Sequence, residues 1–319
     1  MPTTALAYLE FVAQRRAEVD AALDRWLPRP PACPPAVAEA MRYAVGSGGK
    51  RMRPVLTLAA ADAVATAAGA DEAALAEARR LAMPAACAIE LVHTQSLVHD
   101  DLPAMDDDVL RRGLPTVHVR YGEGLAILVG DGLLAEAFGL LAREPEDAGS
   151  CDRLARKLRV IAMLGDTVGA GGMVGGQALD LAHTGSVATR DTCDLPALVD
   201  MHARKTGGLI RAAAVAGAVM AGADDAAEAA LAAFGERVGL AFQIVDDILD
   251  VEGTADAIGK TVGKDAHAAK PTYATLLGCA RARAAATDAV DEALAALEHA
   301  HLATLHLTAF ARSVVTRLR

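Results

Sequence analysis

Apolar side chains recur three and four residues apart along most of this chain, which is the spacing of one helix face. Clusters of glycine and proline interrupt the pattern and mark where helices end. We expect helices at about residues 1–27, from 35, 54–68, 71–102, 122–142, 150–182, 195–221, 225–251, and from 271 to the end. No connecting segment is long enough to divide the chain, so residues 1–319 are predicted to form a single all-α domain.

Composition supports the helical prediction and narrows the class of protein. Alanine dominates, 53% of residues are hydrophobic, and only 3% are aromatic, a balance that favours helices over strands. Nucleic acid and anionic membranes would both repel a protein with a formal net charge of −10. We therefore expect no nucleic-acid partner.

Cysteine use and apolar runs indicate a reduced, cytoplasmic setting. The five cysteines are widely spaced and form no C-x-x-C pair, which fits neither a disulfide framework nor a zinc site. The longest apolar stretches, such as residues 212–223, are well below the roughly 20 residues of a membrane span. We expect no transmembrane segment and no signal sequence.

Two acidic clusters follow apolar, helix-compatible runs. The first, HDDLPAMDDD, contains Asp100, Asp101 and Asp106, and the second, DDILD, contains Asp246 and Asp250. Buried helices rarely hold carboxylates that have no partner. Asp246 and Asp250 share a helix face at a spacing of four, so their charges repel unless a cation lies between them.

The first cluster must fold back on itself. Pro103 disfavours continuation of the helix, so Asp106 should come from a loop that returns towards Asp100. Carboxylate oxygens with room left for water and phosphate suit Mg²⁺ better than zinc or copper.

Basic residues accompany both clusters and predict a diphosphate site. Some lie at a predicted helix N-terminus, where backbone amides already favour an anion. The others follow the first cluster or surround the second. The candidates are Lys50, Arg51, Arg53, Arg111, Arg112, Lys205, Lys260, Lys264 and Lys270.

Two other site types fit these motifs less well. Gly48-Gly49-Lys50 resembles part of a nucleotide-binding loop, but Ala44 and Arg51 stand where that loop needs glycine and a hydroxyl residue. Glu90-x-x-His93 and Glu298-x-x-His301 have the spacing of a di-iron helical bundle. A di-iron site would leave both aspartate clusters unexplained.

Six motifs give the chain a resemblance to the trans-isoprenyl diphosphate synthases, particularly the bacterial farnesyl and geranylgeranyl diphosphate synthases. Between about residues 43 and 277 they read GGKRMRP, ELVHTQSLVHDDLPAMDDDVLRRG, GGQALDLA, KTGGLIRAA, FQIVDDILD and GKTVGKDAHAAKPTY. The resemblance implies an isoprenoid synthase-type bundle of ten or more helices around a central cavity, usually a homodimer. It also implies condensation of isopentenyl diphosphate with dimethylallyl, geranyl or farnesyl diphosphate.

The resemblance further implies roles for individual residues. Three Mg²⁺ ions would be held by Asp100, Asp101, Asp106, Asp246 and Asp250. The allylic diphosphate would contact Arg111, Lys205, Lys260 and Lys270. Isopentenyl diphosphate would contact Lys50, Arg53, His93 and Arg112. Cavity-facing polar groups would be Thr206 and Gln243, whose oxygens face the developing carbocation, and Gln177.

Product length is predicted from the helix below the first cluster. In the resembled family, the fifth residue before the aspartate pair lines the floor of the product channel. Here it is Gln95, about 7 Å below the carboxylates at 1.5 Å rise per residue, and Ser96 follows it. Both C15 and C20 products are compatible with these side chains.

Two alternatives share the helical fold. A class I terpene cyclase would carry an Asn/Asp, Ser/Thr and Glu pattern in place of Asp246 to Asp250 and would not need Lys50 and Arg53. A non-catalytic helical partner subunit would have lost one acidic cluster. Both clusters are present in this sequence.

Overall fold

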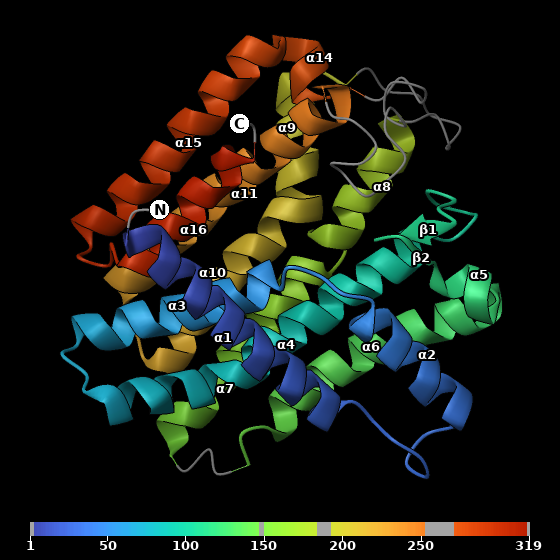
Figure 1. Ribbon diagram of the computed structural model, residues 1–319, viewed down its shortest axis with the longest axis horizontal. Helices are drawn as coiled ribbons and strands as arrows, with labels where there is room; N and C mark the ends of the chain where they lie inside the picture. The colour runs from blue at the N-terminus through green and yellow to red at the C-terminus, as the bar shows by residue number, and fades with distance from the viewer. Residues whose placement is uncertain (1–2, 147–149, 184–192, 253–270, 318–319) are drawn as a thin grey trace.

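The computed structural model describes residues 3–146, 150–183, 193–252 and 271–317, and helices make up almost all of their regular structure (Figure 1). In the first half of the chain these are α1 (Thr3–Trp26), α2 (Pro35–Gly46), α3 (Met52–Ala67), α4 (Glu72–Asp100), α5 (Val117–Tyr121) and α6 (Glu123–Arg143). In the second half they are α7 (Cys151–Val168), α8 (Met173–His183), α9 (Leu195–His202), α10 (Gly208–Ala221), α11 (Asp225–Glu252), α14 (Tyr273–Leu277), α15 (Cys279–His299) and α16 (Leu305–Thr316). The predicted all-α class is confirmed.

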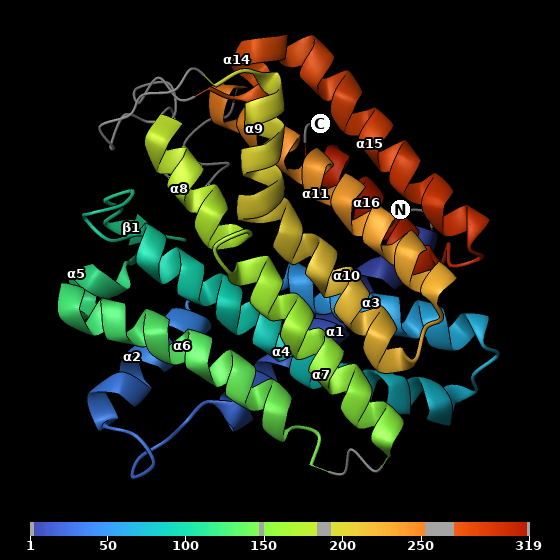
Figure 2. The same ribbon diagram turned by 180° about the vertical axis from the view of Figure 1, so that it is seen from behind.

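The core forms where α3, α4, α10 and α11 pack against one another, and α15 covers the outer side of α11 (Figures 1 and 2). Helices α3 and α10 are buried along most of their length. This agrees with their sequences, which are apolar on nearly every helix face. Their alanine-rich contact is close. A Cβ added to Gly217 on α10 would overlap the carbonyl oxygen of Thr57 and lie 3.0 Å from the Cβ of Ala60 on α3.

Three predicted helices are divided in the structure. The helix expected at 150–182 breaks after Val168, where an added Cβ at Gly172 would overlap the Thr167 carbonyl. The helix expected from 271 ends first at Gly278, which adopts φ +79°, and restarts directly as α15. It ends again at His299, and α16 begins after Thr304, whose side chain accepts from the Leu307 amide. The helix expected at 195–221 contains a π-helical turn, η1 (Ala203–Gly207).

A short hairpin after α4 was not predicted. Strand β1 (Leu110–Arg111) pairs antiparallel with β2 (Leu114–Pro115), and Leu110 lies opposite Pro115. Two-residue strands are too short to produce an alternating pattern in the sequence.

Two helices, α4 and α6, are long and apolar enough to cross a membrane by length and composition alone. Polar residues interrupt the apolar sequence of both helices, so uninterrupted apolar runs do not reveal them. In α4, 72% of the most apolar segment is buried inside the fold, as expected for a core helix. In α6 the buried share is 39%, so this helix presents an apolar face to its surroundings.

The contact between α3 and α10 can be tested by paired glycine substitutions. Gly217→Ala should lower the free energy of unfolding by about 1–3 kcal/mol through overpacking, even though alanine gains about 1 kcal/mol in helix propensity. Gly165→Ala in α7 is the matched control, because no atom lies within 4 Å of the added Cβ. Thermal denaturation should show a lower melting temperature for the first variant alone, and equal effects would contradict the packing.

Candidate active site

The first acidic cluster lies at the C-terminal end of α4, where the chain turns back. The Asp106 amide donates to the Asp100 carbonyl at 2.8 Å, and the Asp108 amide donates to the Asp101 carbonyl at 3.2 Å. This is the return of Asp106 that Pro103 led us to expect. The loop therefore brings Asp106 over the same helix end as the two preceding aspartates.

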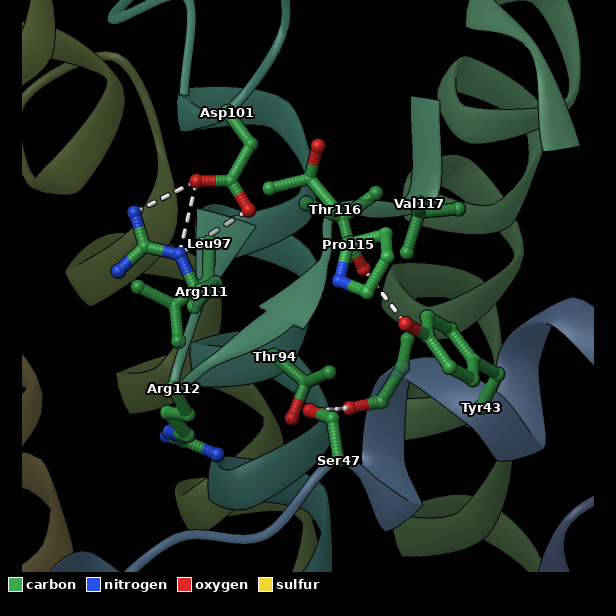
Figure 3. Close-up of a pocket in the computed structure, with 12 residues that line it drawn as sticks. Tyr43, Ser47, Thr94, Leu97, Asp101, Arg111, Arg112, Pro115, Thr116 and Val117 are labelled. Carbon is green, nitrogen blue, oxygen red and sulfur yellow. Dashed lines mark hydrogen bonds and ion pairs between the residues drawn. The ribbon is translucent and has the colours of Figure 1, made fainter. Parts of the chain in front are cut away.

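Asp101 is held by Arg111 from the hairpin (Figure 3). Arg111 Nε lies 2.7 Å from Oδ1 and 3.0 Å from Oδ2 of Asp101, and Nη2 lies 2.6 Å from Oδ1. Arg111 Nη2 also reaches Asp108 at 3.5 Å. Asp101, Arg111 and Arg112 line a pocket beside α2 and the hairpin. The unpredicted strand pair directs Arg111 to the acidic cluster, while Arg112 lies towards the loop before α3.

Asp100 is in an environment that disfavours its negative charge. Burial raises its pKa to about 6, and the nearby carboxylates of Asp106 and Asp101 add to the effect. Lys205 and Arg111 oppose the shift. A divalent cation at this position would relieve the remaining imbalance.

The π-helical turn η1 positions Lys205 and Thr206. Lys205 Nζ lies 2.5 Å from Asp180 Oδ2 on α8. Burial disfavours the ammonium, but Asp180 and Asp100 outweigh it and raise the pKa of Lys205. A π turn inserts a residue into a helix and redirects the side chains near it, and such turns are frequent at functional sites.

Two glycines let neighbouring helices approach this turn. A Cβ at Gly176 on α8 would overlap the Lys205 amide nitrogen and lie 2.8 Å from its Cα. A Cβ at Gly239 on α11 would lie 2.9 Å from the Gly207 Cα. The turn is therefore held between α8 and α11. The sequence analysis missed Asp180, although it stands in GGQALDLA four residues after Gly176, on the same helix face.

The second acidic cluster divides into a structural and an accessible part. Asp247 is buried and accepts hydrogen bonds from Gln243 Nε2 at 2.9 Å and from the Tyr273 amide at 2.8 Å. It therefore ties α11 to the start of α14. Asp246 and Asp250 are both less buried than Asp247.

Asp246 is paired with the C-terminal helix. Arg317 Nη1 lies 2.8 Å from Asp246 Oδ1, and its guanidinium lies over the Phe242 ring, 5.2 Å from the centroid. Arg317 belongs to none of the predicted motifs. The fold brings it to the second cluster because α16 packs along α11.

Several arginine side chains surround His93 near the two acidic clusters. Burial lowers the pKa of Arg53, while Glu90 and Asp246 oppose that shift. Burial also lowers the pKa of His93 well below its ordinary value, and the charges of Arg53, Arg112 and Arg111 lower it further. His93 is thus neutral in a strongly positive environment. Through Arg53, this environment extends to Asp246 in the second cluster.

The loop before α3 brings Arg112 and Lys50, two further predicted diphosphate ligands, close to Arg53 and His93. The Arg112 guanidinium donates to the Gly48 carbonyl, and an added Cβ at Gly49 would lie 2.7 Å from Arg112 Nη1. Lys50 is exposed beside this contact. The glycine pair is needed here because Gly48 has φ +89° and Gly49 φ +140°.

Arg51 has a structural role instead of the predicted anion-facing one. It is buried and lies 2.7 Å from Glu90 and 2.8 Å from Asp20, and it also donates to the Val45 carbonyl. Glu90 is thereby committed to Arg51, which contradicts a di-iron site at Glu90-x-x-His93. Within the described ranges, no three His, Cys, Asp or Glu side chains form a metal-binding group.

The remaining predicted residues fall into three groups. Lys260, Lys264 and Lys270 lie outside the described residues. Gln177 Nε2 and Arg53 Nε are buried donors without a hydrogen-bond partner in the part of the chain that the structure describes. Gln95 bonds to His99 at 3.1 Å, and Ser96 donates to the His93 carbonyl at 2.9 Å, so both are held within α4.

Comparison with known proteins agrees with this geometry. The chain is 38% identical over 309 residues to a geranylgeranyl diphosphate synthase from Cyanophora paradoxa, covering 97% of this chain and 96% of the relative. It is 42% identical over 278 residues to a farnesyl diphosphate synthase from Geobacillus stearothermophilus, covering 87% of each. A crystal structure of an FPP/GFPP synthase from Zymomonas mobilis superposes with a TM-score of 0.81 at 35% identity, covering 98% and 99% of the two chains.

The similarity to a known family extends over most of the chain and is not limited to single motifs. Residues 34–306, from the start of α2 to α16, match the polyprenyl synthetase family. That range includes both acidic clusters, the cations between them and the π-helical turn. The chain belongs to the polyprenyl synthetase family.

Proposed function

We propose that this protein is a short-chain trans-prenyltransferase that condenses isopentenyl diphosphate with allylic diphosphates to give farnesyl and/or geranylgeranyl diphosphate. The observation that carries the proposal is the cationic group around Arg53 and His93: Arg111 in this group pairs with Asp101 of the first cluster, and the negative charge of Asp246 of the second cluster acts on Arg53. One substrate can then be held at the carboxylates through metal while the other is held by side chains. The relatives are named as synthases of these products, and none of those reported above is a terpene cyclase.

The acidic residues fit Mg²⁺ as the cofactor. Asp100 is partly protonated near neutral pH without a cation because burial raises its pKa to about 6. Asp101 and Asp246 are paired with Arg111 and Arg317, pairs that can exchange for a metal. Bound Mg²⁺, three ions in all, held by Asp100, Asp101, Asp106, Asp246 and Asp250, would neutralise the diphosphate as it leaves.

The side chains around the leaving group supply donors and dipoles. Lys205 and Arg111 donate to the allylic diphosphate as negative charge develops on it, and Lys260 and Lys270 are further candidates. The oxygens of Thr206 and Gln243 would face the allylic carbon and stabilise positive charge there, with Gln177 on α8 as a further cavity-facing group. The departing diphosphate takes the proton released when the new bond has formed, so no side chain is needed as base.

The second substrate is held without metal. Arg53 and Arg112 are fixed guanidinium groups suited to a diphosphate, and Lys50 adds a mobile charge. His93, being neutral, donates a hydrogen bond without adding to the repulsion among the arginines. The unsatisfied Arg53 Nε is one donor that such a substrate would satisfy.

We further propose a cytoplasmic homodimer without a transmembrane segment. On α6, Ile127 is 46% and Leu128 is 58% exposed, and on α7, Leu158 is 66% exposed. A second copy covering this apolar face would account for the low burial of α6.

Substitution of one aspartate in each cluster tests the mechanism. Asp100→Ala and Asp246→Ala should each lower turnover by several orders of magnitude, because each removes charge neutralisation at the leaving group. The assay incubates the enzyme with isopentenyl diphosphate, each allylic starter in turn and Mg²⁺, and sizes the dephosphorylated products by chromatography. Near-normal turnover in either variant would refute the role of that residue.

Neighbouring aspartates on α11 should respond differently in a stability measurement. Asp247→Ala leaves the buried Tyr273 amide without its acceptor and should lower the free energy of unfolding by about 1–3 kcal/mol. Asp250→Ala is the control, because this less buried carboxylate should affect activity and leave unfolding nearly unchanged. Urea denaturation of both proteins distinguishes the two roles, and equal stability would contradict the anchoring of α14.

The dimer can be tested with one charge on α6. Leu128→Lys should shift the protein from dimer to monomer in sedimentation velocity, because it places a charge in the proposed apolar contact. Leu305→Lys on α16, at another exposed leucine (40%), is the control and should leave the dimer intact. A wild-type protein that sediments as a monomer would overturn the proposal.

A further inference from the structure

The hairpin that carries Arg111 has little apolar packing to hold it in place. Each of its strands is two residues long, and the side chains of Leu110 and Leu114 are exposed. A two-stranded hairpin is marginally stable at best in water when it has no apolar face to bury. The position of this hairpin must therefore be set by specific contacts with the helices around it.

The contact with α4 is one that the proposed reaction gives up. In the ligand-free protein Arg111 pairs with Asp101 at the end of α4. In the proposed reaction Arg111 leaves Asp101 for the allylic diphosphate. The hairpin then loses this tie to α4 just when the position of Arg111 matters.

Helix α2 holds the base of the hairpin from the opposite side of the pocket in Figure 3. The Tyr43 hydroxyl donates to the Pro115 carbonyl oxygen at 2.6 Å. Pro115 lies opposite Leu110 in the strand pair, and Leu110 immediately precedes Arg111. The bond from Tyr43 therefore fixes the hairpin one residue away from the arginine.

A second tie to this side of the pocket holds the other end of the hairpin. The Arg112 guanidinium, in the turn, donates to the Gly48 carbonyl in the loop after α2. Arg112 is itself a proposed ligand of isopentenyl diphosphate, so this bond also competes with substrate. The hydroxyl of Tyr43 has no such second role, and its bond can persist throughout the reaction.

The ring of Tyr43 is fixed by α5. The Arg120 guanidinium lies over this ring, 4.3 Å from its centroid, and the Tyr121 ring meets it edge-on with centroids 5.5 Å apart. Cation–π and edge-to-face contacts of this kind are favourable. The hydroxyl is thus held ready for the Pro115 carbonyl, so little side-chain entropy is lost when the bond forms.

We propose that Tyr43 is a positioning residue that keeps Arg111 within reach of the allylic diphosphate after Arg111 has left Asp101. This inference rests on the proposed prenyl transfer and deepens it. Tyr43 touches neither substrate nor metal in this account. It acts through the backbone of the hairpin.

The test measures binding of inorganic pyrophosphate with Mg²⁺ by calorimetric titration. Tyr43→Phe keeps the ring and removes only the hydroxyl. It should raise the Kd about fivefold, the factor that one net hydrogen bond supports, and leave the number of binding sites unchanged. Loss of folded protein would lower the number of sites instead, and that result would overturn the positioning role.

Tyr121→Phe is the matched control. Its hydroxyl donates to Glu39 at 3.1 Å and does not reach the hairpin, although the two tyrosine rings are in contact. The Kd of this variant should equal that of the wild type. An equal rise in both variants would contradict a specific role for the Tyr43 hydroxyl.

Hydrogen exchange gives a second measurement that does not depend on affinity. The Thr116 amide donates to the Val109 carbonyl at 3.1 Å and closes the hairpin. With Mg²⁺ and pyrophosphate bound, exchange in the segment 109–116 should be about fivefold faster in Tyr43→Phe, because one hydrogen bond that opposes opening is lost. Equal exchange in the two proteins would overturn the proposal.

A double substitution separates positioning from general damage. Arg111→Gln should weaken pyrophosphate binding, and adding Tyr43→Phe should then change the Kd by less than about twofold, because no guanidinium is left to position. A fivefold change in both backgrounds, or an unchanged Kd in Tyr43→Phe, would overturn the proposal while prenyl transfer stands. A wild-type enzyme that binds pyrophosphate with Mg²⁺ but makes no prenyl product would overturn the proposed function, and these comparisons would still decide the role of Tyr43.

Discussion

Carboxylates placed at the ends of buried helices repel one another and need opposite charge close by, and this constraint shapes the site. The protein meets it with Arg111 at Asp101 and Arg317 at Asp246. The negative charge of Asp100 is neutralised less completely by neighbouring cations, and burial raises the pKa of this residue to about 6. Such an arrangement is poised for divalent cations, because each arginine can exchange its carboxylate for the anion that the metal brings.

Other charged groups are committed to structure, and they fix the geometry of the functional ones. Arg51 pairs with Glu90 two residues before Arg53, so a buried ion pair sets where α3 begins. Asp247 joins α11 to α14 next to Asp246. A buried, paired charge that has lost its partner is strongly destabilising, so these residues cannot double as ligands. In these motifs, charges that anchor the fold therefore alternate with charges that are left for ligands.

The sequence predicted what local pattern controls. Apolar periodicity located the long helices, Pro103 predicted the return of Asp106, and the acidic and basic clusters supplied the residues of the candidate site. It did not reveal that Arg51 is buried or that Arg317 reaches Asp246, because both depend on helices far apart in the chain. The π-helical turn also escaped prediction, since it depends on the close approach of α8 at Gly176 and of α11 at Gly239.

Binding of inorganic pyrophosphate, measured by calorimetric titration with and without Mg²⁺, tests most directly whether both acidic clusters act on one anion. The account predicts that wild-type protein binds pyrophosphate tightly only with Mg²⁺. It also predicts that Asp100→Ala and Asp246→Ala weaken this binding to a similar degree, although the two residues lie on different helices. Metal-dependent binding that one of these substitutions leaves unchanged would contradict the shared site.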